Sequence, residues 1–363
     1  MASRIVLIGG TAVFGAVLSA CGAVSTVSPP QLTNNLATVA EGGGGQVWAE
    51  ATSFQHGQII AGAAPSAVVL GTPKGTSTGA GIVLSEAAGE AWAGEVAHGT
   101  LALSAVYTGA IGQWTPQVLS VEIPGYPGAI AATGAGAAYA VVGGAGGGTK
   151  SQELVRLARG GAESSVVLGT RAAISLAASV GCAGVELRSV AVVFGDPMVL
   201  GSCADAAKAV VIDVAGHSAR MADAPAGYSY AGFSGLVVSR GAARFAAVVE
   251  KASGHWAWII GPGPFRPAPL EFRPTIGPSV AAAPDGALWI LIPGGSAGSV
   301  IRVVAGRSGA HYAAPPNAQG IGAASSAGAL VVAGGRSSNL LALYQLRGPR
   351  FVRVRAVAVP AGD

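Results

Sequence analysis

The chain has 363 residues, of which 51% are hydrophobic and only 10% are charged, and its formal net charge is +4. An apolar content this high excludes an intrinsically disordered protein. The length is enough for one large domain or two modest ones.

The N-terminus carries one basic side chain, Arg4, followed by an uncharged apolar run over residues 5–20. This run has the length of a signal peptide and is short for a membrane span, which needs about 20 apolar residues. It ends in Leu18-Ser19-Ala20-Cys21, a tetrad that resembles the lipobox of bacterial lipoproteins. The resemblance implies that residues 1–20 are removed, that acyl chains are attached at Cys21, and that the chain is held on the extracytoplasmic face of a cell membrane.

The same segment has two other interpretations. An uncleaved signal anchor stays open. A dinucleotide-binding turn at Gly9-Gly10 would need a helix and then a strand that ends in an acidic residue. The chain continues instead into the Ser, Thr and Pro residues of 25–30, so we expect no nucleotide cofactor.

Residues 21–45 are rich in Ser, Thr, Pro and Asn and end in four consecutive glycines. We interpret them as a flexible tether. The predicted organisation is therefore a signal peptide at 1–20, a lipidated cysteine with a tether at 21–45, and a folded domain at 46–363.

The folded domain is predicted to be all-β. Short runs of Val, Ile, Leu and Ala are broken by Gly, Pro and Ser every five to ten residues, and helical periodicity is hard to find. One unit of four predicted strands covers 129–132, 138–142, 153–157 and 165–168. Later units of the same kind cover 279–312 and 321–354.

Four-stranded units that recur every 40 to 55 residues are typical of the blades of a β-propeller. Unit starts near residues 35, 80, 128, 173, 227, 278 and 319 predict seven blades, with six or eight still open. The third strands of three units align, at 154–157, 210–214 and 300–304. A pair of β-sandwiches is the main structural alternative.

With Cys21 assigned to lipid, Cys182 and Cys203 remain as an even pair outside the reducing cytoplasm. Residues 185–194 and 198–203 read as two strands joined by a turn at Gly195-Asp196-Pro197. Antiparallel pairing brings the two cysteines close together, so we predict a disulfide, with two buried free thiols as the alternative.

Trp256 and Trp258 stand out in a chain with only 6% aromatic residues. They alternate along a predicted strand and so share one face. They are interpreted as packing between neighbouring blades or, alternatively, as an exposed candidate platform on which a sugar or peptide stacks.

The segment Pro284-Asp285-Gly286-Ala287-Leu288-Trp289 is similar to the Asp-Gly-x-x-Trp turn of several bacterial propeller families, including regulator-type and streptogramin-lyase-like propellers. This resemblance implies a propeller fold, and a single copy implies no particular activity.

Basic residues gather near the C-terminus, at Arg347, Arg350, Arg353 and Arg355. Arg353 and Arg355 alternate with valines, which predicts the outward face of an edge strand. A nucleic-acid patch is the alternative, but the exported address argues against it. We predict no nucleic-acid partner and a weak attraction to anionic lipid headgroups.

The sequence contains no catalytic constellation, metal cluster or cofactor motif. The five histidines lie far apart in the sequence, at His56, His98, His217, His255 and His311. Ser234 lies in a shifted version of the Gly-x-Ser-x-Gly nucleophile motif. The sequence therefore predicts a lipid-anchored propeller that binds a protein or a cell-envelope component, with an extracytoplasmic lyase or hydrolase as the alternative.

Overall fold

The computed structural model describes the backbone within residues 39–358 and the side chains within residues 129–354, in both cases with gaps. The backbone ranges are 39–42, 46–52, 57–63, 66–71, 82–87, 90–97, 100–108, 115–117, 122–124, 126–133, 136–143, 152–158, 165–263, 266–275, 277–304, 307–324, 328–334 and 340–358. The side-chain ranges are 129–133, 136–143, 152–158, 165–263, 266–275, 277–304, 308–322 and 342–354. Cys21 and the predicted signal peptide lie outside these residues.

The described strands form seven antiparallel sheets, numbered here in chain order. The first contains β1 (Val39–Gly42), β2 (Gln46–Thr52), β3 (Gly57–Ala63) and β4 (Ser66–Gly71). The second contains β5 (Ile82–Ala87), β6 (Glu90–Ala97), β7 (Thr100–Thr108), β8 (Thr115–Gln117) and β9 (Glu122–Pro124). The third contains β10 (Tyr126–Ala132), β11 (Ala137–Gly143), β12 (Glu153–Ala158) and β13 (Ser165–Leu168).

The remaining four sheets follow the same scheme. The fourth contains β14 (Glu186–Val193), β15 (Asp196–Ser202), β16 (Lys208–Asp213) and β17 (Ser218–Asp223). The fifth contains β18 (Tyr228–Phe233), β19 (Val237–Ser239), β20 (Ala242–Lys251), β21 (Trp256–Gly261) and β22 (Ala268–Leu270). The sixth contains β23 (Ser279–Ala282), β24 (Leu288–Ile292), β25 (Ser299–Val304) and β26 (Arg307–Ala313), and the seventh contains β27 (Ala318–Ala324), β28 (Gly328–Gly334), β29 (Leu340–Arg347) and β30 (Arg350–Ala358).

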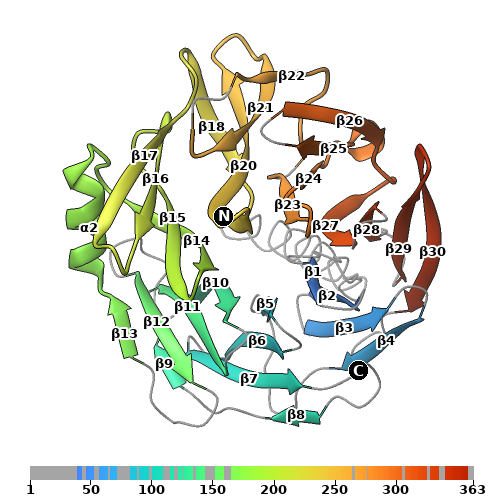
Figure 1. The fold of residues 1–363 in the computed structure, drawn as a ribbon, viewed down its shortest axis with the longest axis horizontal. Coiled ribbons are helices and arrows are strands. Elements are labelled where there is room, and N and C mark those ends of the chain that lie inside the picture. Colours follow the sequence, from blue (N-terminus) through green and yellow to red (C-terminus); the bar gives the residue numbers. More distant parts are fainter. Residues whose placement is uncertain are drawn as a thin grey trace, which may run out of the picture. The chain divides into compact units, whose positions relative to one another are not determined.

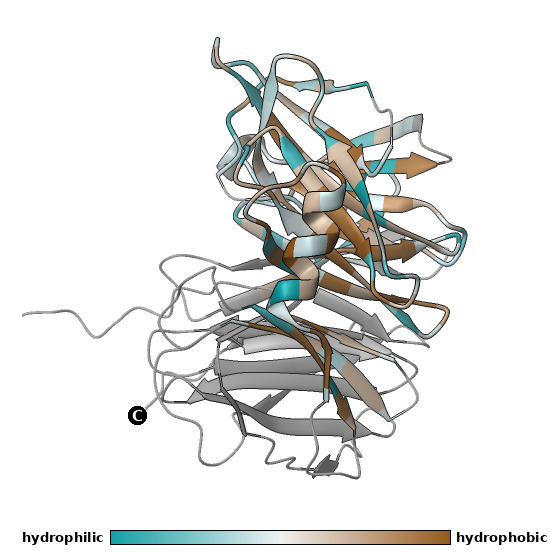
Figure 2. Ribbon diagram, turned by 90° about the vertical axis from the view of Figure 1, so that its left-hand side faces the viewer, coloured by the Kyte–Doolittle hydropathy of each residue, from teal (hydrophilic) through white to brown (hydrophobic). Residues whose placement is uncertain are grey.

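Five of the sheets are meanders in which consecutive strands pair, whereas β9 pairs with β7 in the second sheet and β18 and β19 both pair with β20 in the fifth. The colours of Figure 1 therefore change sheet by sheet along the chain. Figure 2 shows the apolar residues concentrated along the strands. The middle strands are buried on both faces. On β21, for example, Ala257 and Ile259 face the core shared with the fourth sheet, whereas Trp258 and Ile260 face the core shared with the sixth. This two-sided burial explains why the strands read as continuous apolar runs.

Neighbouring sheets contact one another through their first strands, except that the short second strand β19 takes this place in the fifth sheet. Strand β5 contacts β1 and β10, β14 contacts β10 and β19, β23 contacts β19 and β27, and β27 contacts β1. Serines on these strands add hydrogen bonds across the junctions. The Oγ of Ser189 accepts the N–H of Leu236 at 2.8 Å, and the Oγ of Ser239 donates to the carbonyl of Gly286 at 2.9 Å.

The predicted units match the sheets closely. Six sheets begin within four residues of a predicted start, and the three aligned segments are the third strands β12, β16 and β25. The strand predicted at 185–194 ends one residue early, because Phe194 and Gly195 form the turn while Asp196 and Pro197 already belong to β15.

The exception is the unit predicted to start near residue 173, where the chain forms helix α2 (Thr170–Ser179) and the fourth sheet begins only at Glu186. Ala173 and Ala177 are the buried residues of the helix, and it contacts β16 and β17. The small alanines gave little contrast between buried and exposed positions, so the sequence did not reveal this helix. No helix in the described part of the chain is long and apolar enough to cross a membrane.

Strand β1 lies within residues 21–45, which we interpreted as a tether. It pairs with β2, with Val39 opposite Ala49 and Gly42 opposite Gln46. The first described strand therefore begins at Val39, before the run of glycines.

Candidate functional site

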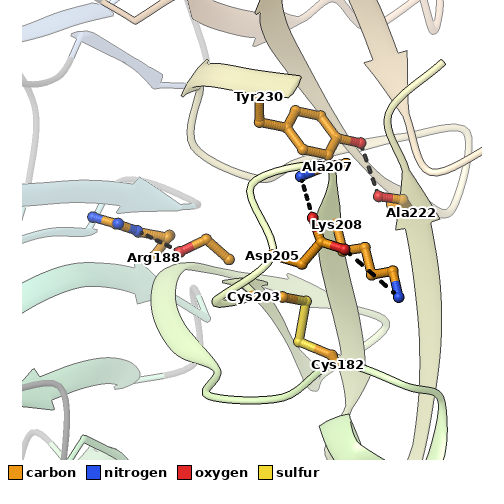
Figure 3. The surroundings of a disulfide bond; sticks show 9 residues. Cys182, Arg188, Cys203, Asp205, Ala207, Lys208, Ala222 and Tyr230 are labelled. Atoms are coloured by element: carbon orange, nitrogen blue, oxygen red, sulfur yellow. Dashed lines mark hydrogen bonds and ion pairs between the residues drawn. A yellow bond between two sulfur atoms is a disulfide. The ribbon is translucent and has the colours of Figure 1, made fainter. Parts of the chain in front are cut away.

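A disulfide joins Cys182 to Cys203, as the sequence predicted (Figure 3). The two Cα atoms are 5.3 Å apart, within the range that a disulfide spans. Cys182 follows α2, and its N–H donates to the carbonyl of Ala177 at 3.0 Å. Cys203 begins the connection between β15 and β16. The bond therefore ties the C-terminal end of the helix to the sheet that follows it.

The polar side chains around the disulfide make local hydrogen bonds and an ion pair that stabilise the fold. Asp205 accepts the N–H of Ala207 at 2.9 Å and lies 3.7 Å from the ammonium of Lys208. The hydroxyl of Tyr230 donates to the carbonyl of Ala222 at 2.8 Å (Figure 3). Burial, helped by the negative charge of Asp223, raises the pKa of Tyr230, so the hydroxyl stays protonated and serves as a donor between the fourth and fifth sheets.

The two tryptophans of β21 lie in the core between the fifth and sixth sheets. Trp258 is 5% exposed. Trp256 is half-buried against the same core, and the guanidinium of Arg273 lies 5.6 Å from its ring centroid. Trp258 cannot be part of an exposed stacking platform, because the neighbouring sheet covers its ring. Packing between sheets accounts for the pair.

The Asp-Gly-x-x-Trp turn is built by hydrogen bonds within the sixth sheet. Asp285 accepts the N–H of Ala287 at 2.9 Å and a hydrogen bond from Arg302 at 2.6 Å. The guanidinium of Arg302 lies 5.7 Å from the ring centroid of Trp289. The Ala287 hydrogen bond, together with the charge of Arg302, lowers the pKa of Asp285. The motif therefore stabilises the turn, and nothing in these contacts indicates chemistry.

The described histidines lie apart on the surface. His217 is an exposed turn residue, and the rings of His255 and His311 each hydrogen-bond to a nearby serine. His56 and His98 lie outside the described residues. Among the residues that the structure describes, no three His, Cys, Asp or Glu side chains come together in a group that could hold a metal ion.

The sequence did not reveal that Phe194 and Arg240 are exposed turn residues. Both have positive φ angles, 52° in each case, and both precede a glycine in a two-residue hairpin turn. Asn and Asp are preferred at this position, and another residue there costs about 1 kcal/mol. An X-Gly pair between two apolar strands was the available signal, but Phe194 read as the last residue of its strand.

Comparisons of this chain with known sequences and solved structures give information about its fold. No protein-family model matches the chain, and no curated protein sequence matches it.

Solved structures that resemble this chain are β-propeller proteins. The structure titled Kuenenia stuttgartiensis hydrazine synthase has a TM-score of 0.60 at 10% identity, covering 89% of this chain and 99% of that chain. A puromycin-hydrolyzing peptidase from Mycobacterium tuberculosis has a TM-score of 0.55 at 12% identity, covering 90% of this chain and 53% of that one. YCF48 from Cyanidioschyzon merolae has a TM-score of 0.50 at 14% identity, covering 84% and 93%. At these identities the similarity establishes a β-propeller domain and no activity.

Proposed function

We propose that this chain is an extracytoplasmic β-propeller, anchored through lipid on Cys21, that binds a protein or another component of the cell envelope. The observation that carries the proposal is the tetrad Leu18-Ser19-Ala20-Cys21 directly after an uncharged apolar run. The bond between Cys182 and Cys203 supports the same address, because disulfides persist in oxidising compartments and are rare in the cytosol.

The proposed propeller has seven blades, one for each sheet. Closure of the circle would depend on the contacts of β1 with β27 and of β4 with β30. Each of these pairs joins the first sheet to the last one, and none of the described strands pairs across the two sheets. Packing alone would then hold the two ends of the domain together.

Binding is favoured over catalysis because the best candidate polar groups are engaged in the fold. Ser234 is 4% exposed, and its hydroxyl accepts the N–H of Ala246 at 2.8 Å. The two described groups with a clear pKa shift, Tyr230 and Asp285, are explained by packing and turn contacts. Both pKa values move away from neutral pH, whereas a carboxyl or phenol group that acts as general acid or base works best with a pKa near the working pH.

The alternative is an extracytoplasmic lyase or hydrolase with a site over the centre of the propeller. Two of the similar structures carry enzyme names, a synthase and a peptidase, but the similarity to them is one of fold. Turnover of a cell-envelope substrate by the purified chain would favour this alternative.

A crosslinking pull-down from the native membranes tests the proposal, with the Cys21→Ala variant as control. We expect the full-length protein to recover one partner at near-equal stoichiometry and the variant, released from the membrane, to lose it. An empty pull-down by protein that remains in the membrane fraction would count against a stable protein partner.

A further inference from the structure

The sheets have two chemically different ends. At the turn end, the first strand of a sheet turns into the second and the third into the fourth. At the connection end, the second strand leads to the third and one sheet leads to the next. Contacts between turns place the turn ends of three sheets next to one another. The ring of Phe194 lies where a Cβ on Gly241 would be, and the side chain of Arg240 lies in the same way against Gly286.

Exposed large apolar side chains gather at the turn end. The described part of the chain has five, and only Ile174, on α2, belongs to the connection end. Phe194 is 90% exposed at the tip of the β14–β15 hairpin. Val304 is the last residue of β25, and Val166 and Val352 lie within the first three residues of their strands after a turn.

Basic charge gathers at the same end. We counted the charged side chains in each turn and in the three strand residues on either side of it. At the turn end, the described residues of these regions comprise eight arginines, no lysine and three aspartates, Asp196, Asp213 and Asp285. Two of the arginines, Arg244 and Arg302, are partly buried and hydrogen-bonded. The other six are exposed and make no ion pair with a described residue: Arg156, Arg220, Arg240, Arg266, Arg347 and Arg350.

The connection end is balanced by comparison. Counted in the same way, its described residues comprise five basic and six acidic side chains. Several are already paired, as in the contact of 2.6 Å between Arg188 and Glu186. The ammonium of Lys251 lies 4.9 Å from the ring centroid of Tyr228. Both the surplus of positive charge and the exposed apolar groups therefore belong to the turn end.

The backbone supports a role for this surface. Phe194 and Arg240 both occupy a left-handed conformation that Asn or Gly would adopt with less strain. Local strain of this kind is concentrated at functional sites. Here it holds an aromatic ring and a guanidinium outward at neighbouring turns.

From these observations we propose that the turn end of the sheets docks on a membrane surface that contains anionic lipid. Guanidinium groups bind phosphate in a two-point geometry, which suits lipid headgroups. A protruding Phe194 ring and scattered valines suit the boundary between headgroups and acyl chains, where shallow apolar insertion adds to electrostatic attraction. The proposal rests on the membrane address proposed above and adds an orientation, in which the connection end faces away from the bilayer.

The test uses the full chain reconstituted in vesicles that contain lipids with a doxyl quencher on their acyl chains. One set of vesicles is phosphatidylcholine alone, and the other contains equal parts of phosphatidylglycerol and phosphatidylcholine. The Phe194→Trp variant reports on the turn end. The matched control is Ala226→Trp, an exposed position in the turn between β17 and β18 at the connection end. The unsubstituted protein corrects for the six native tryptophans.

We expect added quenching in the Phe194→Trp variant in the anionic vesicles, little in neutral vesicles, and none for Ala226→Trp. Adding Arg350→Gln to the Phe194→Trp variant should lower the equilibrium constant for docking on anionic vesicles about fivefold, because one basic residue near an anionic surface contributes about 1 kcal/mol. Arg171→Gln, on the exposed side of α2, should leave that equilibrium unchanged.

Equal quenching at both positions, or none at either, would overturn the proposal. If soluble polyglutamate changes the tryptophan fluorescence of the Phe194→Trp variant and vesicles do not quench it, the surface binds an acidic polymer. That result would also overturn the proposal. Loss of lipid from Cys21 is scored separately by membrane fractionation, so failure of the anchor and failure of this surface are distinguishable.

Discussion

Removal of the disulfide is expected to destabilise the domain by an amount that the structure allows us to calculate. The bond joins residues 21 positions apart. In the chain-entropy model, closing a loop of this length stabilises the folded state by about 3 kcal/mol. The perturbation is the double substitution Cys182→Ala/Cys203→Ala, because changing one cysteine alone would leave a free thiol beside the core.

Urea unfolding followed by circular dichroism measures the effect. With a denaturant slope of about 3 kcal/mol per molar urea, the midpoint should fall by about 1 M. All proteins carry Cys21→Ala, so that the pair under test supplies the only thiols. Dithiothreitol should shift the protein with the intact pair by a similar amount and leave the double variant unchanged.

A midpoint that stays the same after both cysteines are replaced would refute this reasoning. It would mean that α2 and the β15–β16 connection are held together by their other contacts, such as the hydrogen bond from the N–H of Ala204 to the carbonyl of Ala183 at 2.9 Å.

Three further predictions concern the core and one surface turn. Trp258→Ala should lower the free energy of unfolding by about 3–5 kcal/mol and the half-buried Trp256→Ala by clearly less, as chemical denaturation would show; equal losses would contradict the difference in burial. Gly261→Ala should cost more than about 2 kcal/mol in the same assay, because its Cβ would meet the buried ring of Phe245; an unchanged midpoint would mean that the ring has room to move. The lowered pKa of Asp285 means that its ionised form stabilises the fold above the ordinary Asp value of about 3.9 and that this stabilisation disappears as the pH falls through the folded-state pKa. The Tm of the native protein should therefore exceed that of Asp285→Asn at neutral pH and converge with it in acid, and a constant difference would contradict the assignment.

The positions and spacing of the strands could be predicted from the sequence because the sheets are regular. Third strands such as β12 and β25 are bounded by Gly and Ser and carry Val, Ile and Leu, so both their position and their place in the sheet were predictable. The cysteine pairing was predictable for the same reason, since two antiparallel strands bring residues at their far ends together.

Features that depend on tertiary packing were not readable. Helix α2 exposes and buries alanines alike, so its amphipathic pattern is weak. The burial of Trp258 depends on the sixth sheet, which begins some 20 residues later in the chain. The accumulation of arginines and apolar side chains at the turn end emerges only when turns from five different sheets are brought to the same end, and no sequence window contains them.

The most direct test of the central claim is the mass of the N-terminal peptide of the protein extracted from its own membranes. The account predicts a peptide that begins at Cys21, carries a diacylglyceryl group on sulfur and lacks residues 1–20. An unmodified cysteine inside an intact N-terminus that still begins at Met1 would contradict the lipid anchor and favour the uncleaved signal anchor.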